Sequence, residues 1–331
     1  MIKLLDCTLR DGGYVNEWYF GKKAIREIKT SVEESGVELI EVGFLKDVKY
    51  SPNKTLFPGV EWAESVVYPK KKDVTYCLMV DAPIPYPIDR IGKREVNGID
   101  AIRIIVWKEK IHECVEYSKK LIDKGYQVFI QPARVSQYSV PEFEHLIYCF
   151  SKIDITAFYV VDSWGTEDSC SITSYMNLSW DWIGDKALLG YHGHNHKQQA
   201  LSCAEEILQY NTDVILDCSI FGMGRGAGNL NTELIMAHLN DRYEKHYNIK
   251  PILNAYSNYI KDYYDEFGWG YSMKHFMTAI FNCNARYINY IMDNTDLSMD
   301  KVYEIFQRMT EKQRIDYSET LIKELINDAR S

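Results

Sequence analysis

The chain has 331 residues, 46% of them hydrophobic, which is enough for one large domain with an appendage or for two ordinary domains. Its formal net charge of -9 and its pI near 5.5 argue against a nucleic-acid partner, because a protein that binds the phosphate backbone needs a basic face. The sequence has no apolar run of about 18 residues and no pattern of a secretory signal, so we expect no membrane partner and a cytoplasmic location.

Eight apolar runs rich in valine, isoleucine and aromatic residues predict eight β-strands. In chain order they are Ile2–Thr8, Val37–Phe44, Val74–Val80, Ala101–Lys108, Gln127–Ala133, Ala157–Ser163, Ala187–His192 and Val214–Ile220. Amphipathic segments with helical spacing lie between them, among them Lys22–Glu34, Ile111–Lys124, Glu142–Ser151, Gln198–Tyr210 and Leu230 to about Tyr243. This alternation predicts an α/β fold, a (β/α)8 TIM barrel, with a doubly wound open sheet as the competing architecture.

The pattern changes after the eighth unit. From Pro251 to Ser331 no run resembles a strand, and helical patterns cover Ile252–Phe267, Ser272–Asp293, Ser298–Met309 and Ser318–Arg330. We therefore expect a barrel domain over residues 1–245 and a C-terminal helical domain over residues 246–331. Its many aromatic side chains predict that this appendage covers the barrel mouth or mediates assembly, although packing within the appendage would also explain them.

Polar side chains stand at the carboxyl-terminal ends of the predicted strands, where a barrel places its active site. They are Arg10, Asp11, Glu41, Arg103, Gln131, Asp162, His192, His194 and Asn229. Among them Arg103, Gln131 and Asp162 are candidates for substrate binding. Taken singly, each of these residues also fits a structural role; Glu41, for example, could be a carboxylate that pairs with Arg103 or Arg10.

His192 and His194 form the strongest motif. Residues two apart on a strand face the same side, so the two imidazoles can bind one ion, although a strand histidine can also be a satisfied core residue. Asp11 adds a carboxylate and Asn229 a fourth oxygen ligand. Such a set with open positions suits Mn, Mg, Co, Zn or Fe(II) better than a closed structural zinc site, which recruits thiolates. The predicted cofactor is a divalent metal, Mn or Mg foremost, acting as a Lewis acid.

The glycine-rich segment from Gly222 to Asn229 has two interpretations. Its Gly222-x-Gly224-x-x-Ala227 pattern follows a strand and precedes a helix, as a dinucleotide-binding fingerprint does. No strand with an acidic end follows at the distance where the ribose-binding carboxylate belongs, however. We therefore favour a loop that places Asn229 or contacts an anionic group of the substrate.

Together these motifs resemble the DRE-TIM metallolyase superfamily, which is HMG-CoA lyase-like and is named for an Asp, an Arg and a Glu that match Asp11, Arg10 and Glu41. The resemblance covers residues 1–240 and rests on four motifs in order, Asp6-x-Thr8-Leu9-Arg10-Asp11-Gly12, Ile40-Glu41-Val42, His192-x-His194-Asn195 and Gly228-Asn229. It implies that Asp11, His192 and His194 bind the metal, with Asn229 at or near it. It also implies that Arg10 faces the oxygen of an enolate and that Glu41 holds Arg10 in place, in agreement with the charge that an enolate develops.

Within the superfamily, the chain looks most like the 4-hydroxy-2-oxovalerate aldolases. That resemblance implies a metal-dependent aldolase that acts on a 4-hydroxy-2-oxoacid through a pyruvate-type enolate, with a 2-oxoacid and an aldehyde as substrates. In those aldolases a histidine after the Arg-Asp-Gly segment acts as acid or base, whereas Tyr14 stands here. Tyr14 is therefore our candidate base; alternatively it packs at the entrance and a water on the ion takes the proton.

The resemblance leaves partners and two other functions open. Related aldolases bind a dehydrogenase through their C-terminal helices, so a homo-oligomer or a dehydrogenase partner through these helices is an expectation of the same kind. One alternative function is a Claisen-type acyl-CoA condensing enzyme, although that branch typically has Gly-Glu-Arg where this chain has Gly224-Arg225-Gly226. The other is a barrel without catalysis that serves as a binding subunit.

Overall fold

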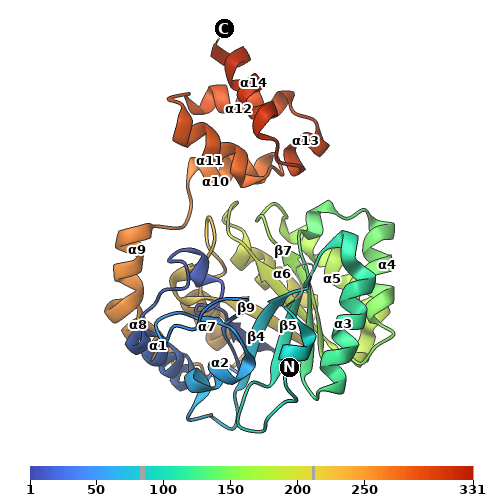
Figure 1. Cartoon of the computed structure of the whole chain (residues 1–331), viewed down its shortest axis with the longest axis vertical. Helices are drawn as coiled ribbons and strands as arrows, with labels where there is room; N and C mark the ends of the chain where they lie inside the picture. Colours follow the sequence, from blue (N-terminus) through green and yellow to red (C-terminus); the bar gives the residue numbers. More distant parts are fainter. Residues whose placement is uncertain (83–85, 211–212, 331) are drawn as a thin grey trace.

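The structure is a computed structural model that describes residues 1–82, 86–210 and 213–330. Its centre is a closed barrel of eight parallel strands, with helices around it (Figure 1). The strands are β1 (Lys3–Asp6), β2 (Leu39–Leu45), β4 (Thr75–Asp81), β5 (Ala101–Val106), β6 (Gln127–Pro132), β7 (Ala157–Asp162), β8 (Leu188–Gly193) and β9 (Val214–Cys218). Because β1 pairs with both β9 and β2, the sheet closes on itself, and the prediction of a TIM barrel is confirmed over the open sheet.

One short strand escaped the sequence analysis. The two-residue strand β3 (Leu56–Phe57) extends the sheet beside the end of β2. There the backbone carbonyl of Thr55 lies so close to Gly43 that a Cβ at this position would come within 2.2 Å of it. Glycine is therefore required where the two segments touch, and strand β2 is irregular between Glu41 and Gly43.

Helices cover the outside of the barrel in the alternation that the sequence predicts. They are α1 (Lys22–Ser35), α2 (Val60–Val67), α3 (Ile111–Asp123), α4 (Val140–Phe150), α5 (Ser169–Ile183), α6 (Ala200–Tyr210) and α7 (Thr232–Arg242). Gly36 ends α1 with φ 88° and ψ 14°, the left-handed conformation that closes a helix. In the described part of the chain, no helix is both long and apolar enough to cross a membrane.

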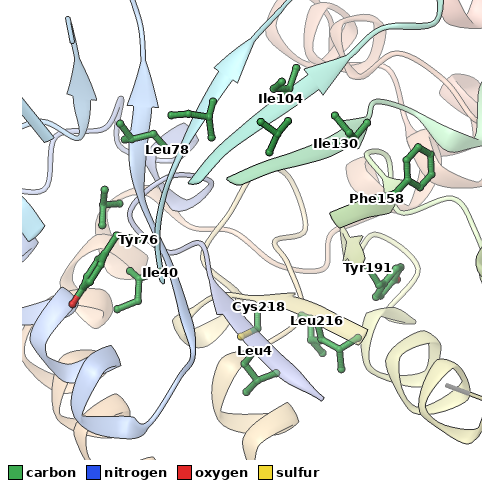
Figure 2. Close-up of a cluster of buried hydrophobic side chains, with 14 of the residues drawn as sticks. Leu4, Ile40, Tyr76, Leu78, Ile104, Ile130, Phe158, Tyr191, Leu216 and Cys218 are labelled. Atoms are coloured by element: carbon green, nitrogen blue, oxygen red, sulfur yellow. The ribbon is translucent and has the colours of Figure 1, made fainter. Parts of the chain in front are cut away.

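The strands pack apolar side chains outward and a mixed layer inward. Figure 2 shows the outward side chains, including Leu4, Ile40, Ile104 and Phe158, which belong to the large core beneath the helices. The barrel interior has a smaller core of its own, including Leu5, Cys77, Phe129, Tyr159 and Ile215. Since alternate residues of a strand face opposite sides, the interior positions also include the charged residues Glu41, Arg103 and Asp217.

The C-terminal segment divides by packing into two parts. A nearly continuous helical stretch consists of α8 (Ile249–Ala255), the π-helix η7 (Tyr256–Ile260) and α9 (Lys261–Phe267). Helix α8 packs on α1 and α7, and Ile252, Ala255 and Ile260 are buried in the barrel's large core. The division of the chain at residues 245 and 246 remains a prediction, and the packing shows that this first stretch is attached to the barrel.

The remaining helices form a unit with its own core over the carboxyl-terminal ends of the strands (Figure 1). They are α10 (Met273–Ile280), α11 (Ala285–Asn294), α12 (Met299–Arg308), α13 (Glu311–Ile315) and α14 (Glu319–Arg330). The segment Ser272–Asp293, predicted as one helix, is two, because Asn282 has φ 46° and the Asn284 side chain caps α11. The expectation that the appendage covers the barrel mouth matches this placement.

Candidate active site

Three predicted metal ligands meet at the carboxyl-terminal end of the barrel. Asp11 lies in the turn after β1, and His192 and His194 lie at the end of β8. One ligand atom from each residue lies within 4.8 Å of the others, and all three side chains are buried. Among the described residues this is the one group of three or more His, Cys, Asp or Glu side chains with such spacing.

The protonation states of these residues suit a cation. Burial alone would raise the pKa of Asp11, but Arg10, His194, His192 and a hydrogen bond from Asn229 hold it below its ordinary value. Burial lowers the pKa of His194 to about 4, against the opposing effect of Asp11, so its imidazole is neutral near pH 7 and keeps a lone pair. The site therefore offers an ionised carboxylate and a neutral imidazole at neutral pH.

Two buried atoms without hydrogen-bond partners also support a cation site. The buried atoms His194 Nδ1 and Asn229 Oδ1 have no hydrogen-bond partner, which is uncommon for buried polar atoms. The Asn229 amide nitrogen donates to Asp11 Oδ2 at 2.8 Å, so Asn229 reaches the site by fixing the orientation of this carboxylate. The residues present thus fit a divalent ion by charge, by donor type and by the lone pairs they leave free.

His192 is oriented by a residue that the sequence analysis missed. Its Nδ1 lies 2.9 Å from Asp217 Oδ2, and an ionised carboxylate can only accept a hydrogen bond, so Nδ1 carries the proton and Nε2 keeps the lone pair. Burial opposes ionisation of Asp217, yet Arg103 and His192 hold its pKa below the ordinary value. The sequence did contain a signal for Asp217, because it is a charged residue inside the apolar run Val214–Cys218.

A chain of alternating charges joins the two sides of this site inside the barrel. Arg10 donates to Asp11 Oδ1 through Nη1 and to Glu41 Oε2 through Nε, each at 2.5 Å. Arg103 lies 2.9 Å from the same Glu41 oxygen through Nη1 and donates to Asp217 through Nη2. Three carboxylates and two guanidinium groups leave one net negative charge before any ion binds.

A cavity of about 120 Å³ lies above these groups. Of the predicted site residues, Arg10, Asp11, Tyr14, Gln131, His192 and His194 line it. Glu41, Arg103, Asp162 and Asn229 lie outside its lining: the first two belong to the charge chain, and Asn229 contacts Asp11. The Asp162 carboxylate accepts hydrogen bonds from the backbone N–H groups of Thr166 and Glu167, so it shapes the loop after β7.

Tyr14 stands at the entrance, 41% exposed, with its ring edge-on to Trp18 at a centroid distance of 4.7 Å. Desolvation raises its pKa, although Arg10 acts in the opposite direction. Tyr14 is consequently a neutral phenol at physiological pH in this structure.

The cavity wall also contains side chains that the sequence analysis did not select. They follow strands β5, β6, β7 and β9 and are Trp107, Arg134, Trp164 and Arg225. The sequence could have pointed to these residues by their position just after strand ends, because the loops of a barrel supply substrate contacts.

The glycine loop after β9 does not form part of a dinucleotide fold. Strand β9 is the last strand of the closed barrel, so no further strand offers a ribose-binding carboxylate among the described residues. A Cβ on Gly224 would lie 2.3 Å from Asn229 Nδ2 and 2.7 Å from Asp11 Oδ2. The absence of a side chain at Gly224 allows the loop to approach Asn229 and the predicted metal ligand Asp11.

Comparison with known proteins finds a family that this arrangement resembles. The model of the HMGL-like family matches residues 102–258, which contain both histidines and the glycine loop. Over this segment the chain is similar to the HMGL-like family. Together with relatives named oxaloacetate decarboxylase and 4-hydroxy-2-oxovalerate aldolase, this match shows that the chain is an enzyme of the carbon–carbon lyase class.

Two curated relatives are similar to this chain in sequence, and one solved structure is similar in fold. The chain is 25% identical over 244 residues to an oxaloacetate decarboxylase of Mycobacterium tuberculosis, covering 72% of this chain and 70% of the relative. It is 24% identical over 238 residues to 4-hydroxy-2-oxovalerate aldolase 6 of Rhodococcus jostii, covering 71% and 67%. The fold matches the N-terminal domain of an aldolase candidate from Bacteroides vulgatus with a TM-score of 0.74 at 21% identity, covering 91% of this chain and 99% of that one.

Proposed function

We propose that this HMGL-like enzyme is a divalent-metal-dependent aldolase that cleaves or forms the C3–C4 bond of a 4-hydroxy-2-oxoacid. The observation that carries the proposal is the convergence of Arg10, Asp11, His192 and His194 on one cavity. Relatives named 4-hydroxy-2-oxovalerate aldolase support the reaction class.

Asp11, His192 and His194 would hold the ion, with Asn229 at or near it. A bound divalent ion, with Mn or Mg foremost, supplies positive charge that polarises the keto oxygen of the 2-oxoacid. With one net negative charge in the interior chain, a divalent ion leaves one net positive charge, which suits a substrate that carries one carboxylate. The net charge of the site with the ion bound therefore complements the single negative charge of a 2-oxoacid.

Arg10 is the catalytic cation in this proposal. Glu41 and Asp11 fix its guanidinium by two hydrogen bonds. Burial acts to lower the pKa of Arg10, but the two carboxylates outweigh this effect and raise it. A fixed cation beside the reacting atoms stabilises the negative charge that develops as the enolate forms. Arg103 and Asp162 are positioning residues here. Gln131 remains a substrate-binding residue because it lines the cavity and its buried Nε2 has no hydrogen-bond partner.

In the cleavage direction, the 4-hydroxyl proton leaves, the C3–C4 bond breaks and its electron pair forms the enolate. Protonation of C3 then gives pyruvate or its analogue, and the aldehyde departs. Tyr14 is a neutral phenol, the form that donates a proton to the aldehyde oxygen during condensation. In cleavage the same oxygen, as the phenolate, takes the 4-hydroxyl proton, and the raised pKa of Tyr14 makes this form scarce at neutral pH.

The experiment follows the methyl protons of pyruvate by NMR in D2O with the metal-loaded enzyme. We expect exchange without any acyl-CoA, and condensation products when aldehydes are added. Exchange should disappear with a chelator and in His194→Ala, and should fall by about 100-fold or more in Arg10→Lys. The exposed His112 lies on α3, away from the cavity, and His112→Ala serves as the matched control that keeps wild-type exchange.

Decarboxylation of oxaloacetate is a second candidate, because a relative of that name shares 25% identity and the reaction passes through the same enolate. Release of CO2 from oxaloacetate, with no condensation product from any aldehyde, would move the assignment there. Release of free thiol from an acyl-CoA without pyruvate exchange would instead assign a Claisen-type reaction. Absence of all three activities in the metal-loaded protein would favour a barrel that serves as a binding subunit.

A further inference from the structure

Two arginines without carboxylate partners line the active-site cavity. Arg134 follows β6 and Arg225 lies in the glycine loop after β9. Over residues 1–82, 86–210 and 213–330, neither side chain forms an ion pair or a hydrogen bond. The buried arginines Arg10 and Arg103, in contrast, each contact two carboxylates.

Arg134 is held rigidly at the cavity wall. Its guanidinium carbon lies 4.4 Å from the ring centroid of Trp107 and 5.1 Å from that of Trp164. Trp107 is fixed in turn by a hydrogen bond from Nε1 to Asp81 at 3.2 Å. Stacking on aromatic rings holds a guanidinium in place without consuming its N–H donors, which stay free for a ligand.

The backbone of Arg134 is also constrained. It adopts φ 60° and ψ 60°, the left-handed region that a residue other than glycine rarely occupies, and its N–H donates to Ser163 Oγ at 2.9 Å. Such conformations cost free energy and persist where the surrounding structure imposes them, often at ligand sites. Here the conformation turns the chain after β6 at the cavity wall.

The charge around Arg134 is unbalanced. Desolvation lowers its pKa, and the neighbouring Arg225 lowers it further; Glu109 and Asp316 act in the opposite direction but form no ion pair with it. A second cavity of about 310 Å³ shares Tyr14, Ser163, Trp164 and Arg225 with the first. Its lining adds Lys274 and Arg286 from the C-terminal helices and contains no Asp or Glu. Arg225 lines both cavities and Arg134 the first, and among the described residues neither has a counter-ion, so together they create a site for an anion.

We propose that Arg134 and Arg225 bind an anionic group, a carboxylate or a phosphate, on the aldehyde substrate. This inference rests on the proposed aldolase function and names the class of its second substrate. Arg10 and the metal ligands serve the 2-oxoacid at the floor of the cavity, so the arginine pair is available to the other end of the molecule. Arginine suits this task because its planar fork matches both carboxylate and phosphate oxygens.

The test compares matched aldehydes that differ by the anionic group. Butanal is paired with succinic semialdehyde, and glyceraldehyde with glyceraldehyde 3-phosphate, each condensed with pyruvate. We expect the wild type to prefer the anionic member of at least one pair in kcat/KM, and the pair concerned distinguishes a carboxylate from a phosphate. Arg134→Gln and Arg225→Gln should each reduce this preference by about 10-fold or more, mainly through KM. The control is Arg242→Gln, an exposed arginine at the end of α7 that lines neither cavity.

Three results would overturn the inference. They are a wild type without preference in either pair, equal losses for neutral and anionic aldehydes in the two variants, and a loss confined to the KM of pyruvate. The exchange of pyruvate methyl protons needs no aldehyde, so normal exchange without an anionic preference defeats the inference and leaves the proposed function standing.

If pyruvate does not exchange, the proposed function fails. Calorimetric titration with succinate and with inorganic phosphate then tests whether Arg134 and Arg225 bind an anion. Binding that is lost in Arg134→Gln and kept in Arg242→Gln supports an anion site at the arginine pair. If neither anion binds to the wild type, the arginine pair is not an anion site.

Discussion

At the scale of single residues, the orientation of His192 depends on Asp217, with Arg103 on the far side of that carboxylate. Outer partners of metal-binding histidines fix the tautomer and the direction of the ring, and their loss weakens metal affinity by about 10-fold to 100-fold. Asp217→Asn keeps the shape but can present an N–H to His192 Nδ1. We expect the divalent-ion affinity of this variant, measured by competition with a chelator, to fall within that range.

The fold should survive this substitution, as judged by circular dichroism, because Asn has the same volume as Asp. Asp47→Asn is the matched control, since Asp47 is exposed, pairs with Arg90 and lies outside the cavity. An Asp217→Asn variant with wild-type affinity for every ion tested would exclude Asp217 from the metal site.

A second residue-scale prediction concerns Asp6, which lies at the end of β1 beneath the site. Burial raises its pKa to about 6, although hydrogen bonds from Thr8 and Thr232 act against this shift. A carboxyl group with a raised pKa in the folded state destabilises the protein when it is ionised, above about pH 6. This penalty disappears as the pH falls toward the unfolded pKa near 3.8, and the shift corresponds to about 3 kcal/mol.

The measurement is the free energy of unfolding in urea for the wild type and for Asp6→Asn, between about pH 7.5 and pH 4.5. The variant keeps one oxygen for the Thr8 N–H, and its amide can donate to the Thr232 hydroxyl. We expect the wild type to gain stability relative to the variant as the pH falls. A difference that does not change with pH would show that Asp6 has an ordinary pKa in the folded protein.

At the scale of elements, the glycine loop after β9 is shaped by its close approach to Asp11 and Asn229. Gly224 faces Asn229 and Asp11 so closely that a methyl group would overlap both side chains. Gly224→Ala must therefore displace the loop or the Asp11–Asn229 pair. We expect metal affinity and the rate of pyruvate exchange to fall by about 10-fold or more, since outer contacts of ligands carry effects of that size.

Gly92→Ala is the control for this prediction, because a Cβ at Gly92 would meet no atom within 4 Å and Gly92 lies outside the cavity. Circular dichroism and the urea midpoint show whether the loop variant stays folded. Full metal affinity in a folded Gly224→Ala protein would contradict the close packing of the loop on the ligands.

At the scale of the whole molecule, the C-terminal segment belongs to two cores. Ile252, Ala255 and Ile260 are buried against the barrel, whereas Tyr287, Ile288 and Phe306 are buried in the separate core of α10–α14. A chain that ends at Phe267 keeps the first group and should retain a stable barrel. A chain that ends at Asn248 loses it and should be less stable by about 4 kcal/mol or more, because two buried isoleucines and an alanine are removed.

Urea unfolding of the two shortened proteins and the full chain checks this expectation. If the chain ending at Asn248 is as stable as the one ending at Phe267, helix α8 does not contribute to the barrel core. Metal titration of both proteins provides a second measurement, since the three ligands lie within residues 11–194 and need only an intact barrel.

The sequence alone predicted the barrel, which the structure confirms, and three metal ligands that the structure brings together, because both predictions depend on local patterns. The eight strands were found from apolar runs rich in valine, isoleucine and aromatic residues, and the structure shifts only their ends, by one or two residues. His192 and His194 were selected because residues two apart on a strand share a face, and Asp11 because it follows a strand end. Short β3 and the break between α10 and α11 were missed, because two residues carry no period and the break depends on a turn at Phe281–Asn284.

Tertiary structure decided which charges meet. Arg103 and Asp217 are 114 residues apart, and only closure of the barrel brings them and Glu41 into one interior layer, so a residue expected to bind substrate is paired inside the barrel. Arg134 and Arg225 differ in this respect, since only the folded chain shows that no carboxylate of the described residues forms an ion pair with them. A sequence shows that a charged residue is present, but its partners depend on side chains from distant strands, whose distances are fixed only when the sheet closes.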